Sequence, residues 1–310
     1  MSGIHHVTAI SGSASRNLDF YTRVLGLRFV KRTVNFDDPG TYHLYYGDEA
    51  GHPGTILTFF PWEHAAPGRN GAGLTQETAF RVPAASLGYW THRFVENGVS
   101  HETITKRFGQ PVLSFTDPDG MNLALIGAEG AENEPGWASG DIPVEHAIRG
   151  FESVTFLSAD AAATGRILTE ALGFTQVDNE EGLTRYRATA DVGGFINLRE
   201  GKDFLPGRMG RGSVHHVAFR AKDDAEQAEM ARKLTEALAQ HVTEQKDRKY
   251  FRSVYFREPG GVIFEIATDE PGFAVDEPQA TLGEALQLPS FLEPHRRDIE
   301  ASLPALERAS

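Results

Sequence analysis

The sequence has 310 residues, of which 40% are hydrophobic and 24% charged, and its formal net charge is −13. This composition is typical of a globular protein, and such an acidic chain is a poor partner for nucleic acids or anionic membranes. The chain has no cysteines, which excludes disulfides, thiolate metal sites and cysteine nucleophiles. No signal peptide or membrane-spanning segment is recognisable. We therefore expect a soluble cytoplasmic protein.

The first part of the chain reads as a strand, a helix and three further strands. Residues 3–10, GIHHVTAI, are rich in β-branched and apolar residues and predict a strand. Residues 13–27 follow with apolar residues at helical spacing, and Gly26 stands where the helix should end. Three strand-like runs separated by proline and glycine come next, at residues 28–36, 41–48 and 54–60.

The same order recurs three more times, which predicts an α+β fold of four βαβββ modules. The run DPDGMNLALI (117–126) resembles EPGGVIFEIA (258–267) in the last strands of the second and fourth copies. We assign module 1 to 1–70, module 2 to 71–130, a linker to 131–150, module 3 to 151–205, module 4 to 206–275 and a C-terminal tail to 276–310. Two modules side by side would form one curved sheet around a cavity, giving two paired-module sheets.

Modules 1 and 4 both contain the sequence His-His-Val within a predicted strand. Neighbouring residues of a strand point to opposite faces, so only one histidine of each pair should face the cavity. We take the second of each pair, His6 and His216, as candidate metal ligands. The equivalent positions in modules 2 and 3 are Glu77 and Ser153.

A carboxylate interrupts the last apolar strand of module 4. Glu265 lies among valine, isoleucine and phenylalanine residues. Burying its carboxylate there is costly unless the carboxylate forms an ion pair or binds a cation. The equivalent positions in the other modules have no charge: Ala124, about Leu198, and Thr58 or Phe59. Two imidazoles and one carboxylate favour non-haem Fe(II). Because the ligands come only from modules 1 and 4, these two modules should share a sheet, and modules 2 and 3 the other.

The chain resembles the vicinal oxygen chelate superfamily, which includes glyoxalase I and extradiol dioxygenases. It is most similar to the hydroquinone ring-cleaving dioxygenases, the group of 2,6-dichlorohydroquinone 1,2-dioxygenase and methylhydroquinone dioxygenases. The resemblance runs nearly end to end, through segments such as HHVT, GLRFVKRTVNFDDPGTYHLYYGD, HHVAF and DRKYFRSVYFREPGGVIFE. It implies Fe(II), or Mn or another divalent metal, bound by His6, His216 and Glu265.

The resemblance also implies a small aromatic diphenol and O₂ as substrates, and further site residues. Tyr255 would hydrogen-bond a substrate oxygen, and Arg248 would orient a second hydroxyl or a carboxylate. His5 and His215 would move protons, although strand alternation should point them away from the metal. Thr8 shares the strand face of the first metal-binding histidine and would contact substrate.

Three other functions remain open from the sequence. A glyoxalase-type isomerase usually needs a second carboxylate or glutamine, and the nearest candidate, Glu77, lies in module 2. A catechol extradiol dioxygenase differs only in its substrate geometry. A non-enzymatic aromatic-binding protein of this superfamily would lack the three metal ligands. The sequence also leaves open the substrate's ring substituents, a homo-oligomeric assembly and any role of the C-terminal tail.

Overall fold

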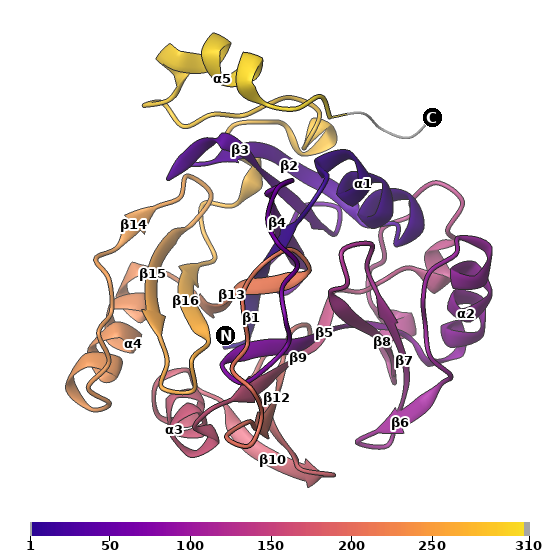
Figure 1. Cartoon of the computed structure of the whole chain (residues 1–310), viewed down its shortest axis with the longest axis vertical. Helices are drawn as coiled ribbons and strands as arrows, with labels where there is room; N and C mark the ends of the chain where they lie inside the picture. The colour runs from indigo at the N-terminus through magenta and orange to yellow at the C-terminus, as the bar shows by residue number, and fades with distance from the viewer. Residues whose placement is uncertain (1, 307–310) are drawn as a thin grey trace.

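The computed structural model describes residues 2–306, which form two eight-stranded sheets with few helices (Figure 1). The first sheet has the order β14 (Lys246–Asp247), β15 (Arg252–Arg257), β16 (Ile263–Thr268), β13 (Ser213–Ala221), β1 (Ile4–Ser11), β4 (Ile56–Pro61), β3 (Asp38–Gly47) and β2 (Arg28–Asn35). The second sheet has the order β10 (Thr175–Glu180), β11 (Leu183–Arg187), β12 (Phe195–Glu200), β9 (Phe151–Ser158), β5 (Leu74–Pro83), β8 (Asn122–Ala128), β7 (Gln110–Thr116) and β6 (Thr105–Arg107).

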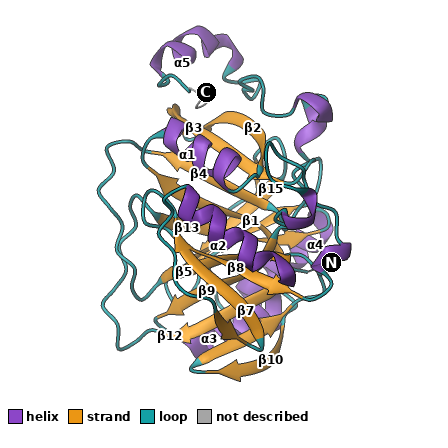
Figure 2. Cartoon of the chain, turned by 90° about the vertical axis from the view of Figure 1, so that its right-hand side faces the viewer, coloured by secondary structure: helices purple, strands orange, loops and turns teal. Residues whose placement is uncertain are grey.

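Four of the α-helices follow the first strand of a module, and the last lies in the C-terminal segment (Figure 2). The α-helices are α1 (Ala14–Asp19), α2 (Leu87–Glu96), α3 (Ala161–Arg166), α4 (Asp224–Glu236) and α5 (Arg296–Ser302). Helices α1 and α3 each continue into a π-helical turn, at Phe20–Val24 and Ile167–Ala171. Short 3₁₀ turns occur at Ala84–Ser86, Ala131–Asn133, Val144–His146, Phe273–Val275, Gln279–Thr281 and Glu293–His295. None of the helices within residues 2–306 is long and apolar enough to cross a membrane.

The strand order confirms the α+β fold of four βαβββ modules. Strands β1 to β4 and β13 to β16 share the first sheet, whereas β5 to β8 and β9 to β12 share the second. The antiparallel pairs β1–β13 and β5–β9 join the two modules of each sheet. The pairing of module 1 with 4 and of module 2 with 3, predicted from the distribution of candidate ligands, is therefore confirmed.

One hydrophobic core links the two sheets. A single cluster of buried residues includes side chains from both sheets and from helices α1, α2 and α4. Across the boundary, Phe156 of β9 lies 5.1 Å from Phe264 of β16, measured between ring centroids. Phe174, which precedes β10, meets Phe219 of β13 edge to face at 5.8 Å. Aromatic rings packed across this boundary hold the two sheets in place relative to each other, because protein interiors are close-packed.

The segment after residue 275, predicted as a tail, packs against the first sheet (Figure 1). Its last four positions, 307–310, lie outside the described residues. Lys31 of β2 is fully buried, and its ammonium group donates to Asp276 at 2.7 Å and also to Glu277. The carboxylate of Asp276 also accepts from Lys249 at 2.6 Å and from the Tyr250 hydroxyl at 3.0 Å. We call these five residues the clasp, since they join module 1, module 4 and the C-terminal segment.

Candidate metal centre

The register of three adjacent strands brings the predicted ligands together. In the antiparallel pair β1–β13, His6 stands opposite Ala218 and Thr8 opposite His216. In the parallel pair β13–β16, Ala218 in turn stands beside Glu265. The three side chains therefore project from neighbouring points at the centre of the first sheet, although Glu265 lies more than two hundred residues from His6 in the chain.

The three donor atoms lie close enough to bind one ion. One ligand atom from each of His6, His216 and Glu265 lies within 4.8 Å of the other two, and all three residues are buried. Glu265 Oε2 is 2.8 Å from His216 Nε2 and 3.3 Å from His6 Nε2. Its other oxygen, Oε1, accepts from the Ser253 hydroxyl, whereas Oε2 has no aligned hydrogen-bond donor.

The first histidine of each pair contacts the second through a ring nitrogen, which strict strand alternation does not predict. The register of β1 with β13 shifts at His5 and again at His215, so each of these residues is the extra residue of a β-bulge. A bulge breaks the strict alternation of side chains. His5 Nδ1 lies 3.0 Å from His6 Nδ1, and His215 Nδ1 lies 2.8 Å from His216 Nδ1.

These contacts are compatible with metal binding through Nε2 of the two candidate ligands. Burial holds the pKa of His5 well below its usual value and lowers that of His215 to about 3, so both are neutral. A neutral imidazole can donate or accept at Nδ1 according to its tautomer, so His5 and His215 can each accept from an Nδ1–H of His6 or His216. Nε2 of each ligand then presents a lone pair, which is how metal-binding histidines are usually oriented.

The donor set fits a divalent metal. Nε2 of His6, Nε2 of His216 and the Glu265 carboxylate converge, and a cation, either a proton or a metal ion, is needed between them. Burial alone would raise the pKa of Glu265, but the nearby His6 and His216 hold it well below its usual value. Two imidazoles and one carboxylate without thiolate are the ligand set of non-haem iron sites with open positions.

The second sheet has no comparable group among residues 2–306. Its register sets Thr155 beside Asn197, so the position equivalent to Glu265 in module 3 is Asn197. The expectation of about Leu198 was wrong by one residue, because the alignment of the last strand was set by apolar pattern alone. In the second sheet the carboxylate of Glu77 forms an ion pair with Arg107. Glu77, the candidate for the second carboxylate of a glyoxalase-type reaction, is therefore already paired.

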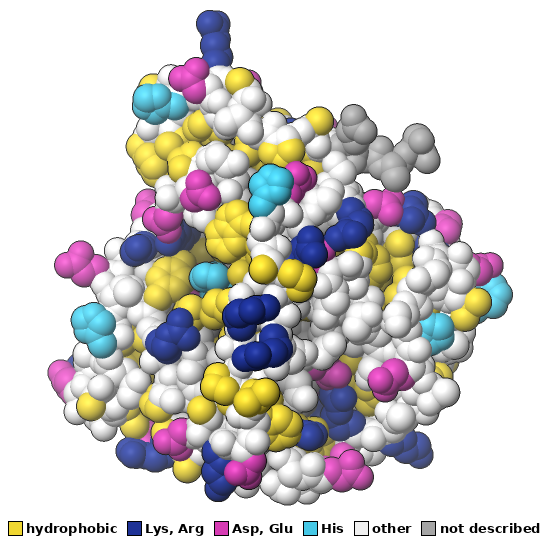
Figure 3. All heavy atoms as spheres, in the orientation of Figure 1, with side chains coloured by type: hydrophobic (Ala, Val, Ile, Leu, Met, Phe, Trp, Pro, Cys, Tyr) yellow, Lys and Arg dark blue, Asp and Glu magenta, His cyan; other side chains and the backbone are white. Residues whose placement is uncertain are grey.

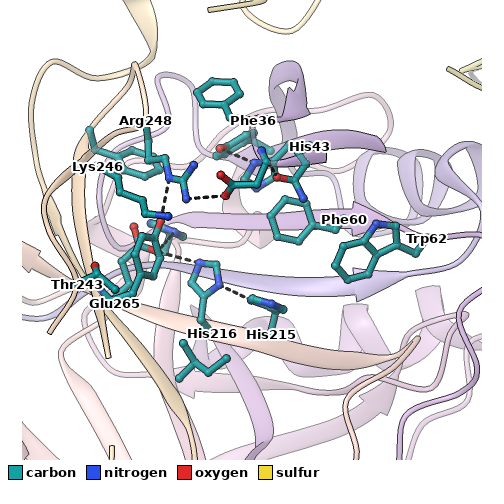
Figure 4. A pocket seen from close by; sticks show the side chains of 17 residues that line it. Phe36, His43, Phe60, Trp62, His215, His216, Thr243, Lys246, Arg248 and Glu265 are labelled. Atoms are coloured by element: carbon teal, nitrogen blue, oxygen red, sulfur yellow. Dashed lines mark hydrogen bonds and ion pairs between the residues drawn. The ribbon is translucent and has the colours of Figure 1, made fainter. Parts of the chain in front are cut away.

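A cavity of about 410 Å³ opens above the three candidate ligands (Figure 4). Arg248 and Tyr255, both predicted as site residues, line it. The Tyr255 hydroxyl accepts from Arg248 Nε at 3.3 Å, and Arg248 Nη2 donates to Asp37 at 3.0 Å. Burial raises the pKa of Tyr255, so the phenol keeps its proton. His215 also lines the cavity, whereas His5 does not.

Thr8 lies behind the cavity wall. It is fully buried and does not line the cavity, contrary to the expectation of a substrate contact. Its hydroxyl accepts from Thr58, which is 2.8 Å from Nε2 of His43. His43 does line the cavity, and its Nδ1 is 2.9 Å from the Tyr45 hydroxyl. Thr8 therefore supports a wall residue, and any effect of Thr8 on substrate would pass through His43.

The sequence did not single out most of the cavity wall. Phe60 and Trp62 form one side, Phe36 lies at another, and Lys246 lies beside Arg248 (Figure 4). The space-filling view shows hydrophobic side chains and a histidine close to Lys and Arg side chains on this face of the molecule (Figure 3). The strand pattern of β4 placed Phe60 in a sheet, but nothing in the pattern indicated that its ring faces the cavity rather than the core.

Comparisons with known proteins agree with this fold. The chain is 45% identical, over 98% of its length and 96% of the relative, to "Putative ring-cleaving dioxygenase MhqO" of Bacillus subtilis. It is 32% identical to "Chlorohydroquinone/hydroquinone 1,2-dioxygenase" of Sphingobium indicum, covering 94% of this chain and 93% of the other. The crystal structure of a "putative dioxygenase" from Bacillus subtilis matches with a TM-score of 0.94 and 44% identity, over 99% and 98% of the two chains.

A more distant structure extends the likeness of the fold. Glyoxalase I from Zea mays matches with a TM-score of 0.62 at 14% identity, over 87% of this chain and 93% of the other. The family model of the superfamily matches twice, at residues 3–125 and 150–266, and so covers all four repeated units. The chain belongs to the Glyoxalase/Bleomycin resistance protein/Dioxygenase superfamily, as its repeats had indicated.

Proposed function

We propose that the protein is an Fe(II)-dependent dioxygenase that opens the aromatic ring of hydroquinone-type diphenols with O₂. The observation that carries the proposal is the convergence of His6, His216 and Glu265 at the floor of an aromatic-lined cavity. The names of the relatives in Bacillus subtilis and Sphingobium indicum support the reaction class. A bound ferrous ion would favour ionisation of a phenolic hydroxyl and offer open positions to the diphenol and O₂.

The residues around the ligands each have a task in this proposal. Arg248 and Tyr255 lie next to each other in the cavity wall and present hydrogen-bond donors to a substrate oxygen. Asp37 holds the guanidinium in this position from the tip of the β2–β3 hairpin. With His216 bound to metal through Nε2, its Nδ1–H would donate to Nδ1 of the neutral His215, whose proton on Nε2 would then face groups in the cavity.

His5 has a more indirect task. It is buried and lies outside the cavity wall, so it acts through the His6 ring rather than on the substrate. We assign it the orientation of that ring, because an outer hydrogen-bond partner fixes the tautomer and direction of a metal-binding imidazole. Thr8 has a similar supporting position behind His43.

The proposal is tested by loading the protein with Fe(II) without oxygen and then measuring O₂ uptake with hydroquinone, methylhydroquinone and catechol. We expect uptake with a hydroquinone, and loss of both bound iron and uptake in His216→Ala. His92→Ala is the matched control, since this histidine is 75% exposed on helix α2. Uptake that survives in His216→Ala, or none with any diphenol, would overturn the proposal. A clear preference for catechol would assign the catechol extradiol reaction instead.

A further inference from the structure

We propose that the cavity selects diphenols that carry a bulky, uncharged apolar substituent, and that this substituent rests on the pair Phe60 and Trp62. The inference rests on the proposed function and specifies its substrate class. The pair, which we call the aromatic wall, consists of the residue before the end of β4 and the residue just after it. Both side chains line the cavity on the side opposite Lys246 (Figure 4).

The cavity is larger than one diphenol ring. The cavity measures about 410 Å³. A water molecule has a share of about 30 Å³ in the liquid, so this space equals that of roughly fourteen waters. One diphenol ring with two hydroxyl groups fills only part of it, and unfilled apolar space forfeits both dispersion and hydrophobic contacts. The cavity therefore has room for a substituent on the ring, and an apolar one would replace water there.

The cavity extends from the candidate ligands to the aromatic wall. His215 joins the two regions, because its ring meets His216 at 5.1 Å and Phe60 at 5.8 Å between centroids. Phe60 then stacks on Trp62 at 5.5 Å with an interplanar angle of 25°. On its other side Phe60 lies 4.3 Å from His43. A ring held near the candidate ligands would thus find a continuous aromatic surface leading away from them.

The charged groups of the cavity lie away from the aromatic wall. Arg248 is already paired with Asp37 and hydrogen-bonded to Tyr255. Lys246 is exposed at the rim and has no ion pair among residues 2–306, and water and salt screen such a charge. The aromatic wall offers no charged group to a substituent lying on it. An anionic substituent lying on the aromatic wall would gain little binding free energy from it, whereas an aryl group would stack on the wall and an alkyl group would pack against it.

The experiment compares kcat/KM of the Fe(II)-loaded protein for four substrates: hydroquinone, methylhydroquinone, phenylhydroquinone and 2,5-dihydroxybenzoate. We expect phenylhydroquinone to exceed hydroquinone by about tenfold or more, since one methylene in an apolar pocket is worth roughly 10–200-fold. In Trp62→Ala this ratio should fall about tenfold, and Trp62→Phe should restore most of it. Phe204→Ala, which removes an aromatic side chain that is 50% exposed and outside the cavity, should leave the ratio unchanged.

A second measurement separates this inference from the proposed function. Anaerobic equilibrium dialysis of hydroquinone and phenylhydroquinone reports binding without turnover, and the same tenfold preference is expected in Kd. Selective binding without O₂ uptake would sink the proposed reaction but support the aromatic wall. Turnover with equal or better kcat/KM for hydroquinone would overturn the wall and leave the reaction intact. A preference for 2,5-dihydroxybenzoate would likewise overturn it, in favour of recognition by Lys246 and Arg248.

Discussion

At the residue scale, the doubled histidines show what a sequence pattern can and cannot predict. The pattern and the repeat singled out His6 and His216, and their Nε2 atoms do converge with the Glu265 carboxylate. Of the first histidines, which were predicted to point away from the metal, His5 lies outside the cavity wall but His215 lines it. Each is a bulge residue, and a bulge depends on how β1 pairs with β13, two strands about two hundred residues apart in the chain. Local sequence does not encode that register.

Replacing His5 tests whether the bulge histidine orients its neighbour. In His5→Ala, the Nδ1–H of His6 loses its acceptor inside the protein. We expect Fe(II) affinity to fall roughly 10–100-fold, the usual cost of losing an outer partner of a metal ligand. An anaerobic titration with Fe(II) measures this. His5→Gln, whose amide oxygen can accept the same bond, should recover part of the affinity. Equal iron binding by the alanine variant and the parent would contradict this task for His5.

At the element scale, periodicity predicted the strands and helices well but not their irregularities. The predicted run 28–36 corresponds to β2, and 54–60 to β4. The π-helical turns that follow α1 and α3 left no signal, because one wider turn hardly changes an apolar pattern of period 3.6. The position equivalent to Glu265 in module 3 was predicted near Leu198 but is Asn197. This error has a similar origin, since the apolar pattern alone cannot fix strand register.

The clasp predicts a measurable dependence of stability on the C-terminal segment. Removing both carboxylates in Asp276→Ala/Glu277→Ala leaves the buried Lys31 ammonium uncompensated. We expect the free energy of unfolding to fall by about 3–5 kcal/mol, as when a buried ion pair loses one partner. Urea unfolding measures this.

A third substitution separates charge from packing in the clasp. Adding Lys31→Met to the double variant removes the unpaired charge but keeps most of the side-chain volume. We expect the triple variant to be more stable than the double variant by at least about 2 kcal/mol, since an apolar replacement of a buried ion pair is often neutral. A triple variant no more stable than the double would show that Lys31 is not held by these carboxylates.

At the scale of the whole molecule, the position of the ligands predicted how the modules pair. His6 and Glu265 could meet only if modules 1 and 4 share a sheet, and they do. The wall of the cavity was beyond such reasoning. Phe60, Trp62 and Lys246 belong to different strands and connections, and their meeting depends on the curvature of the sheet and on the packing of the connections. Those are properties of the closed molecule rather than of any one module.

Contacts between the two sheets predict a pH dependence of global stability. Asp117, at the end of the strand β7 in module 2, accepts from the hydroxyl of the fully buried Tyr21 in module 1 at 3.0 Å. Burial raises the pKa of Asp117 from 3.8 to about 6, aided by the neighbouring Asp119. Since the folded state then binds this proton more tightly than the unfolded state, the contribution of Asp117 to stability is full below pH 4 and is lost as the pH rises through 6.

In the parent protein the Asp117 carboxylate accepts hydrogen bonds from the backbone N–H groups of Asp119 and Met121. Asp117→Asn removes the titrating group and keeps an oxygen that can accept these two bonds. The free energy of unfolding of the variant minus that of the parent should therefore increase by about 1.4 kcal/mol between pH 5 and pH 7.5. Urea unfolding at both pH values measures the difference, and the exposed Asp178→Asn provides the control. A difference that stays constant, or decreases with rising pH, would mean that Asp117 is charged in the folded protein at pH 5. Tyr21 would then bind a carboxylate throughout this range, and the junction of the two sheets would include a buried charge rather than a neutral acid.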